Sequence, residues 1–217
     1  SYASRIAALF DDMERQLHGW DRCVLLRVGA SITIGSQFLP GYVKRFRALH
    51  PGAEIQATMA PSKLLEQKLM DNLLDLALME GVPHVPALQS EEYMEDHLVV
   101  ITPTDGPFRP GQHLSQTEFR QQKFLLRERG SGTREEFERV TEQAGFTVSP
   151  TWEATSTTAL VNAVISGLGI AVLPYRMVSA PLERGLVSAV TVEGLEFHRK
   201  FRIVYPRDNF LTAQARA

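Results

Sequence analysis

The pattern of apolar and polar positions predicts short strands that alternate with amphipathic helices. Leu25–Ala30 is an apolar run short enough for a buried strand, and Phe38–Leu49 repeats large apolar residues at helical spacing. Between them, Ser31–Ser36 is predicted to be a turn of small and hydroxyl-bearing residues. Because strands that alternate with helices form βαβ units, the pattern indicates an α/β fold with mainly parallel sheets.

The same alternation continues as far as residue 205. Thr104–Gly111 is rich in proline and glycine and is the best candidate for a crossover between two lobes. The further strands that we expect are Glu54–Met59, Leu73–Met79, His97–Thr102, Phe124–Arg127, Thr147–Ala154, Ile170–Leu173, Leu186–Val192 and Lys200–Tyr205. The further helices that we expect are Lys63–Asn72, Glu118–Gln122, Arg134–Ala144, Ala159–Ser166 and a short one within Pro174–Pro181.

The two ends of the chain also have helical patterns. Ser1–Gly19 carries one sharp apolar stripe at helical spacing, and a short terminal helix of this kind has to cover an apolar surface. That surface belongs either to the same domain or to a second subunit. Phe210–Ala217 has the pattern of the first two turns of another helix, so we expect this sequence to be part of a longer protein.

Composition narrows the class of protein. A chain of 217 residues with 44% apolar residues allows one large domain or two lobes. The formal net charge of −2 argues against nucleic-acid binding through bulk charge. The single cysteine, Cys23, excludes a disulfide framework. No apolar run approaches the roughly 18 residues of a membrane helix, so we expect no membrane segment.

Three clusters of hydroxyl side chains lie at or just before predicted helix starts: Ser31/Thr33, Ser131/Thr133 and Thr155/Ser156/Thr157. Each could be a helix cap, because serine and threonine are favoured at that position. Alternatively, the hydroxyls and the free N–H groups of the helix starts could bind a small anion together. The sequence leaves both interpretations open for each cluster.

An enzyme is not expected. The six histidines show neither the HExxH pattern nor another paired metal spacing, and no G-x-S-x-G elbow is present. We therefore expect no catalytic residue, no metal site and no cofactor. Gly130–Thr133 is followed by no Gly-Lys-Ser/Thr and is no phosphate loop. Arg129 and Arg134 flank this segment and could neutralise an anion, although solvated surface arginines are the commoner outcome.

Five motifs occur in one order along the chain. They are GASITIGSQFLPGYVKRFRALHP at Gly29–Pro51, LLDLALMEG at Leu73–Gly81, LVVITP at Leu98–Pro103, ERGSGT at Glu128–Thr133 and ISGLGIAVLP at Ile165–Pro174. Through these motifs the chain, from about Leu25 to its end, resembles the effector-binding domain of LysR-type transcriptional regulators.

The resemblance implies an α/β, two-lobed, type 2 periplasmic-binding-protein-like fold, in which a double crossover hinge joins two mainly parallel sheets. Residues 1–23 would be the C-terminal part of a linker helix. Residues 24–103 and 206–217 would form lobe I, and residues 104–205 would form lobe II.

The resemblance also implies the function, the sensing of a small anion or organic acid between the lobes by a cytoplasmic bacterial regulator. The implied partners are a second copy in a homodimer (a tetramer in the full-length protein), RNA polymerase, and DNA through a winged helix-turn-helix outside this chain. An extracytoplasmic solute-binding protein of a transporter is the alternative, and a dimerising Ser1–Gly19 helix favours the regulator. The implied effector-binding residues are Ser31, Thr33, Thr102, Ser131, Gly132, Thr133, Thr155 and Ser156.

Overall fold

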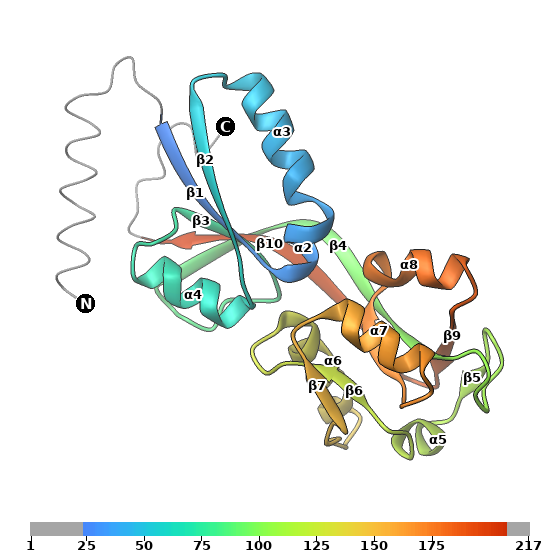
Figure 1. The fold of residues 1–217 in the computed structure, drawn as a ribbon. Helices are drawn as coiled ribbons and strands as arrows, with labels where there is room; N and C mark the ends of the chain where they lie inside the picture. The colour runs from blue at the N-terminus through green and yellow to red at the C-terminus, as the bar shows by residue number, and fades with distance from the viewer. Residues whose placement is uncertain (1–23, 208–217) are drawn as a thin grey trace. The chain divides into compact units, whose positions relative to one another are not determined.

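The computed structural model describes residues 24–207, which divide into two compact units (Figure 1). Within the described residues, unit 1 runs from residue 24 to Tyr93 and resumes at Phe201, and unit 2 is Met94–Lys200. The expected linker helix at residues 1–23 and the expected helix at 210–217 lie outside the described residues. None of the helices within 24–207 is long and apolar enough to cross a membrane.

Unit 1 is built on three parallel strands. β1 (Val24–Ala30) lies between β2 (Ala53–Met59) and β3 (Leu76–Glu80), which pair with it on either side. Helix α4 (Ser62–Met70) contributes Leu65 and Leu69, both fully buried, to the core beside this sheet. Gly29 permits this packing, because a Cβ there would lie only 2.6 Å from the Leu74 Cδ1 atom.

The hydroxyl-rich segment after β1 is helical, which corrects the expected turn at Ser31–Ser36. It forms α2 (Ile32–Gln37), and α3 (Leu39–Leu49) follows directly. Ile34 is fully buried and anchors α2, whose length of six residues gives too few positions for a periodic pattern in the sequence. A Cβ at Gly35 would lie 2.6 Å from the Met59 Cγ atom, so glycine lets α2 approach β2 closely.

Two long strands carry the chain from one unit to the other. β4 (Leu88–Pro103) and β10 (His198–Pro206) pair with each other, and the units divide within each strand, at 93–94 and at 200–201. Both divisions come earlier in the chain than the lobe boundaries that we expected at residues 103 and 206. Thr104–Gly111 is not the crossover: it follows β4 inside unit 2, where Phe108 joins the core.

The strand directions are more mixed than the expected mainly parallel sheets. β10 runs antiparallel to β3, and β4 runs antiparallel to both β8 (Ala171–Pro174) and β9 (Val187–Val192). β5 (His113–Leu114) pairs in parallel with β9. The reason is that β4 and β10 cross between the units in opposite directions, so parallel βαβ pairing cannot continue through them.

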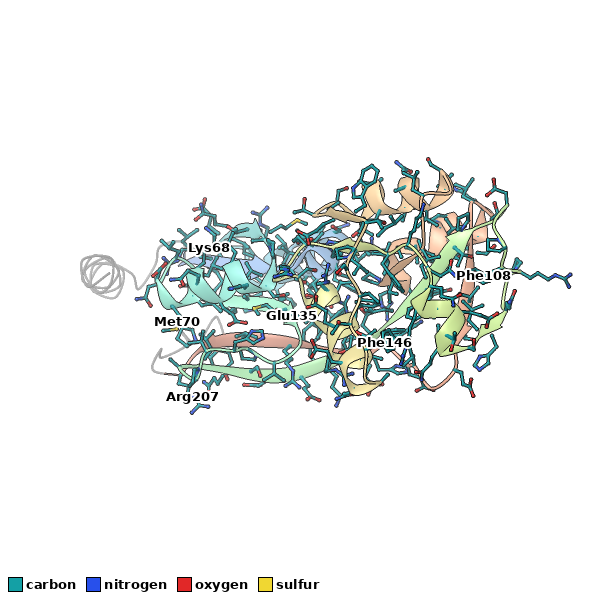
Figure 2. All side chains as sticks on the ribbon, turned by 90° about the horizontal axis from the view of Figure 1, so that it is seen from below. Lys68, Met70, Phe108, Glu135, Phe146 and Arg207 are labelled. Carbon is teal, nitrogen blue, oxygen red and sulfur yellow. The ribbon has the colours of Figure 1, made fainter. Side chains whose placement is uncertain are left out.

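Unit 2 also contains a small separate parallel sheet of β6 (Leu125–Arg127) and β7 (Trp152–Ala154). Helices α5 (Gln116–Arg120), α6 (Gly132–Gln143), α7 (Thr157–Ile165) and α8 (Tyr175–Glu183) connect the strands. Phe146, labelled in Figure 2, lies just beyond the end of α6 and packs against the core, with the Arg120 guanidinium 4.1 Å from its ring centre.

A capping box begins α5 and makes stability depend on pH. The Ser115 Oγ atom accepts from the Glu118 N–H at 3.2 Å, and Glu118 Oε2 accepts from the Ser115 N–H at 2.8 Å. Hydrogen bonds from Ser115 lower the pKa of Glu118 below its ordinary value of 4.5.

We therefore expect Glu118→Gln to destabilise the chain near neutral pH and to have little effect in acid. A lowered folded-state pKa means that the stabilisation is complete above the unfolded-state pKa and is lost as pH falls through the folded-state value. Thermal melts of both proteins from pH 7 down to about pH 3 should converge, because wild-type Glu118 becomes protonated over that range. A melting-point difference that stays constant down to the acid end would contradict the titration of Glu118 as its cause.

Candidate functional site

In unit 1, the carboxyl ends of the three parallel strands bring together buried polar side chains. Ser31 follows β1, Ser62 begins α4 after β2, and Glu80 ends β3. All three side chains are at most 4% exposed. The carboxyl edge of parallel strands is where open α/β sheets bind ligands, so this edge is a candidate site within unit 1.

Ser31 is buried at the start of α2 without capping it. Its backbone N–H donates to the Leu78 carbonyl at 2.9 Å, and its carbonyl accepts from the Gly35 N–H at 2.7 Å. Its Oγ atom has no hydrogen-bond partner among the described residues. Ser31 therefore does not cap its helix, and a buried hydroxyl without a partner costs free energy.

Thr33 lies on the same short helix and is 1% exposed, so the structure holds Ser31 and Thr33 close together in unit 1. Two further polar residues of this unit, Ser62 and Tyr93, were not in the expected effector-binding set, although Ser62 is the expected cap of the helix that became α4. The Ser62 hydroxyl donates to Glu80 Oε2 at 3.4 Å. Burial and the neighbouring Tyr42 raise the pKa of the Tyr93 hydroxyl well above its ordinary value, so Tyr93 stays protonated.

In unit 2, the ERGSGT motif ends at the start of α6. Ser131 is the N-cap residue, is 4% exposed and makes no side-chain capping bond. Gly132 and Thr133 are the first two residues of the helix and are also buried. Ser131, Gly132 and Thr133 therefore stand together at the positive end of a 12-residue helix, an environment that favours an anion.

Thr133 is in contact with a buried ion pair. Its Oγ1 atom accepts a hydrogen bond from the Arg199 Nη1 atom at 3.0 Å, and Arg199 Nε donates to Asp96 Oδ2 at 2.8 Å. Arg176 Nε lies 3.7 Å from the other oxygen, Asp96 Oδ1, which has no hydrogen-bond partner within the described part of the chain. Two guanidinium groups therefore approach the Asp96 carboxylate beside Thr133.

A second buried network connects β6 to α6 and α7. Arg127 pairs through Nε and Nη2 with both oxygens of Glu128, at 2.8 and 2.9 Å, and its Nη1 atom donates to Thr157 Oγ1 at 3.3 Å. Arg134 donates to Glu138 at 2.6 Å and to the Arg127 carbonyl at 3.2 Å. Arg134 is 3% exposed, so the expectation of a solvated surface arginine is wrong for it, whereas Arg129 is exposed.

The remaining residues of the expected set have other surroundings. Thr102 is fully buried in β4 and its Oγ1 atom donates to the Ser188 carbonyl at 3.4 Å. Thr155 is exposed, and Ser156 caps α7 by accepting from the Ala159 N–H at 3.2 Å. Sequence reasoning did not find Arg127, Asp96 or Arg199, because single charged residues in short strands give no periodic signal. No group of three or more metal-ligating side chains occurs within residues 24–207.

These features define a class: an α/β protein of two units joined by two long strands, with uncapped buried hydroxyls at helix starts and no cluster of metal ligands in its described part. The comparisons with known proteins agree with that class. The LysR substrate binding domain family matches residues 23–217, and the chain belongs to this family. The family that the five motifs indicated is thereby confirmed.

The chain is similar in sequence to a transcriptional regulator and similar in fold to several solved structures. The RuBisCO operon transcriptional regulator of Allochromatium vinosum is 31% identical over 192 residues, which cover 88% of this chain and 63% of that protein. The CcmR regulatory domain of Synechocystis PCC6803 in complex with 2-PG has a TM-score of 0.80 at 22% identity, over 88% of this chain and 92% of that chain.

The effector binding domain of QuiR in complex with shikimate has a TM-score of 0.77 at 16% identity, over 88% of this chain and 91% of that chain. Identities this low show a shared fold, and the expected two-lobed α/β fold is confirmed. The family and the relatives support a regulatory domain over the alternative of a transporter's solute-binding protein.

Proposed function

We propose that this ligand-sensing domain recognises a small anion or organic acid through Ser31 and Thr33 of unit 1 and through Ser131 and Thr133 of unit 2. The observation that carries the proposal is that Ser31 and Ser131 both begin helices, are both buried, and both leave their own helix uncapped. In the first, the hydroxyl has no partner in the part of the chain that the structure describes. Thr102, Gly132, Thr155 and Ser156 stay predictions.

The local positive charge at the start of α6 supports an anionic effector. The start of α6 carries the partial positive charge of the helix and lies beside the Asp96–Arg199–Arg176 cluster. Two relatives by fold were solved with small ligands, 2-PG and shikimate. The site residues offer hydroxyl and backbone N–H donors, which suit carboxylate, sulfate or phosphate oxygens. A sensing role needs no catalytic group, and we propose none.

We extend this proposal to a longer regulator of which this chain is one domain. Because the chain spans 63% of the length of its relative from A. vinosum, a regulator of that kind has further residues that could contact DNA. We propose that DNA binding belongs to a separate winged helix-turn-helix, that the regulator works in the cytoplasm as a homodimer or tetramer, and that RNA polymerase is a further partner. The near-neutral charge of this chain supports this division of labour.

The first test is a thermal-shift panel of 2-PG, shikimate, sulfate and inorganic phosphate on the whole chain. A ligand at about a hundred times its dissociation constant adds about 2.7 kcal/mol of apparent stability. For a chain of this size the melting point should then rise by roughly 5–10 °C. Sodium chloride at equal ionic strength is the control for screening. If no member of the panel gives more than the salt control, the proposed effector class is wrong.

The second test concerns the homodimer. Among residues 24–207, β2 stands at the edge of its sheet and β7 pairs with β6 alone, so both have a side on which a second copy could pair. Sedimentation at tens of micromolar should show a dimer, and Trp152→Glu in β7 should weaken it. Leu186→Glu is the matched control, because Leu186 is 44% exposed and Trp152 is 45% exposed. A wild-type monomer, or equal effects of both variants, would contradict the proposed pairing.

A further inference from the structure

Arg199 makes a specific contact to one hydroxyl of the proposed site. Its Nη1 atom donates to Thr133 Oγ1 at 3.0 Å, and both groups are at most 5% exposed. The structure describes no other side-chain hydrogen bond of Thr133 within residues 24–207. A threonine hydroxyl has one proton and two lone pairs, so an arginine that fills a lone pair determines where the proton can point.

The direction of the Arg199 guanidinium is itself fixed. Asp96 stands on the neighbouring strand and its Oδ2 atom accepts from both Nε and Nη2, each at 2.8 Å. This fork leaves Nη1 aimed at Thr133 and holds the planar guanidinium in one orientation. Arg199 therefore cannot accept the Thr133 proton, because a guanidinium has no acceptor, and cannot turn away without losing Asp96.

The same arrangement occurs at the next helix. Arg127 is held by a bidentate pair with Glu128, and its remaining Nη1 atom donates to Thr157 Oγ1 at the first residue of α7. At both helices a buried arginine, anchored by a carboxylate, donates into a threonine of the first turn. In contrast, the Ser156 hydroxyl oxygen caps its own helix by accepting from the Ala159 N–H.

We infer that Arg199 is a positioning residue for the effector: it occupies a lone pair of Thr133 Oγ1 and so makes the Thr133 hydroxyl a donor to the bound ligand. This inference rests on the proposed function, because it assumes that Thr133 contacts the effector. It adds to the proposed function the kind of ligand atom that Thr133 recognises. The Thr133 proton then points away from Arg199, and the ligand atom that it meets is an acceptor, such as a carboxylate, sulfate or phosphate oxygen.

The experiment is a double-mutant cycle measured by calorimetry on the whole chain, with 2-PG and inorganic phosphate as probes. Thr133→Val keeps the shape and removes the hydroxyl, and should weaken binding roughly 10- to 150-fold. Thr133→Ser keeps the hydroxyl and should stay within about threefold of wild type. Arg199→Lys keeps the charge beside Asp96 but cannot make the fork and the Thr133 contact together, and should weaken binding about tenfold.

The decisive measurement is Arg199→Lys in the Thr133→Val background, where it should change affinity by less than about twofold. Equal losses in both backgrounds would mean that Arg199 affects binding by a route other than the Thr133 hydroxyl, and would overturn the inference. So would an unchanged affinity of Arg199→Lys alone. Arg202→Lys, on the same strand but paired with Glu92 at 2.5 Å, is the control.

A replacement variant and the wild-type binding measurement separate failure of the inference from failure of the proposed function. If Arg199→Lys does not fold, the apolar pair Asp96→Leu/Arg199→Met replaces it, because this pair also removes the donor to Thr133 and should give the same loss. Wild type that binds neither probe contradicts the proposed function, and the inference falls with it. Wild type that binds, with Thr133→Val weakened and Arg199→Lys unchanged, overturns the inference alone.

Discussion

Arg199→Met should lower the free energy of unfolding of this chain by about 3–5 kcal/mol. Asp96 is 4% exposed and takes two hydrogen bonds from Arg199, so the substitution leaves a buried carboxylate without its main partner. Arg176 compensates only in part, because its Nε atom lies 3.7 Å from Asp96 Oδ1. Since globular domains have about 5–15 kcal/mol in total, urea unfolding should show a large loss.

The matched control for this prediction is Asp96→Leu/Arg199→Met. A buried ion pair replaced by apolar side chains of similar volume is often neutral or stabilising, because no charge then has to leave water. The double variant should therefore recover most of the stability that Arg199→Met loses. A single variant within about 1 kcal/mol of wild type would show that Asp96 finds another partner, and would contradict the uncompensated-charge explanation.

Ser31→Ala should leave folding stability nearly unchanged and weaken effector binding roughly 10- to 150-fold. The reason is that the Ser31 hydroxyl makes no hydrogen bond to the described residues, so its removal breaks none. In the complex, a hydrogen bond to a charged ligand contributes about 1.5–3 kcal/mol. Chemical unfolding and calorimetric titration with the best probe of the panel measure the two effects separately.

Ser115→Ala gives the opposite pattern and is the control. Ser115 caps α5 through the Glu118 N–H, so its loss should cost about 0.5–2 kcal/mol of folding stability and leave affinity unchanged. If Ser31→Ala behaves like Ser115→Ala, Ser31 is structural after all. Unaltered binding by Ser31→Ala would exclude it from the site whatever its effect on stability.

The sequence predicted the strands best where apolar residues are continuous. Leu25–Ala30 and Ile170–Leu173 became β1 and β8 within one residue at each end. β4 was predicted only from His97 onward, because its first half is rich in charged residues and lacks the period-two alternation of a half-buried strand. Its partner β10 supplies the contacts that make this half a strand, such as the ion pair of Arg202 with Glu92, and they are far away in sequence.

The sequence predicted the residue types of the candidate site but not the hydrogen bonds that these residues make. Serine before a helix is ambiguous between a cap and a ligand contact, and only the structure separates Ser156, which caps, from Ser31, which does not. Arg134 was expected in solvent because its burial depends on Glu138 and on the Arg127 carbonyl of another element. Arg199 and Asp96 meet across 103 residues of sequence, a separation that leaves no local pattern.

The insertion of unit 2 within unit 1 has a consequence for synthesis of the chain. Unit 1 lacks β10 until Phe201 and Val204 have left the ribosome, although both side chains are fully buried in the finished protein. All of Met94–Lys200, the compact unit 2, is made before then. Until β10 is made, β3 has no strand to pair with on that side. The apolar edge of β3 is then exposed to chaperones and to neighbouring nascent chains.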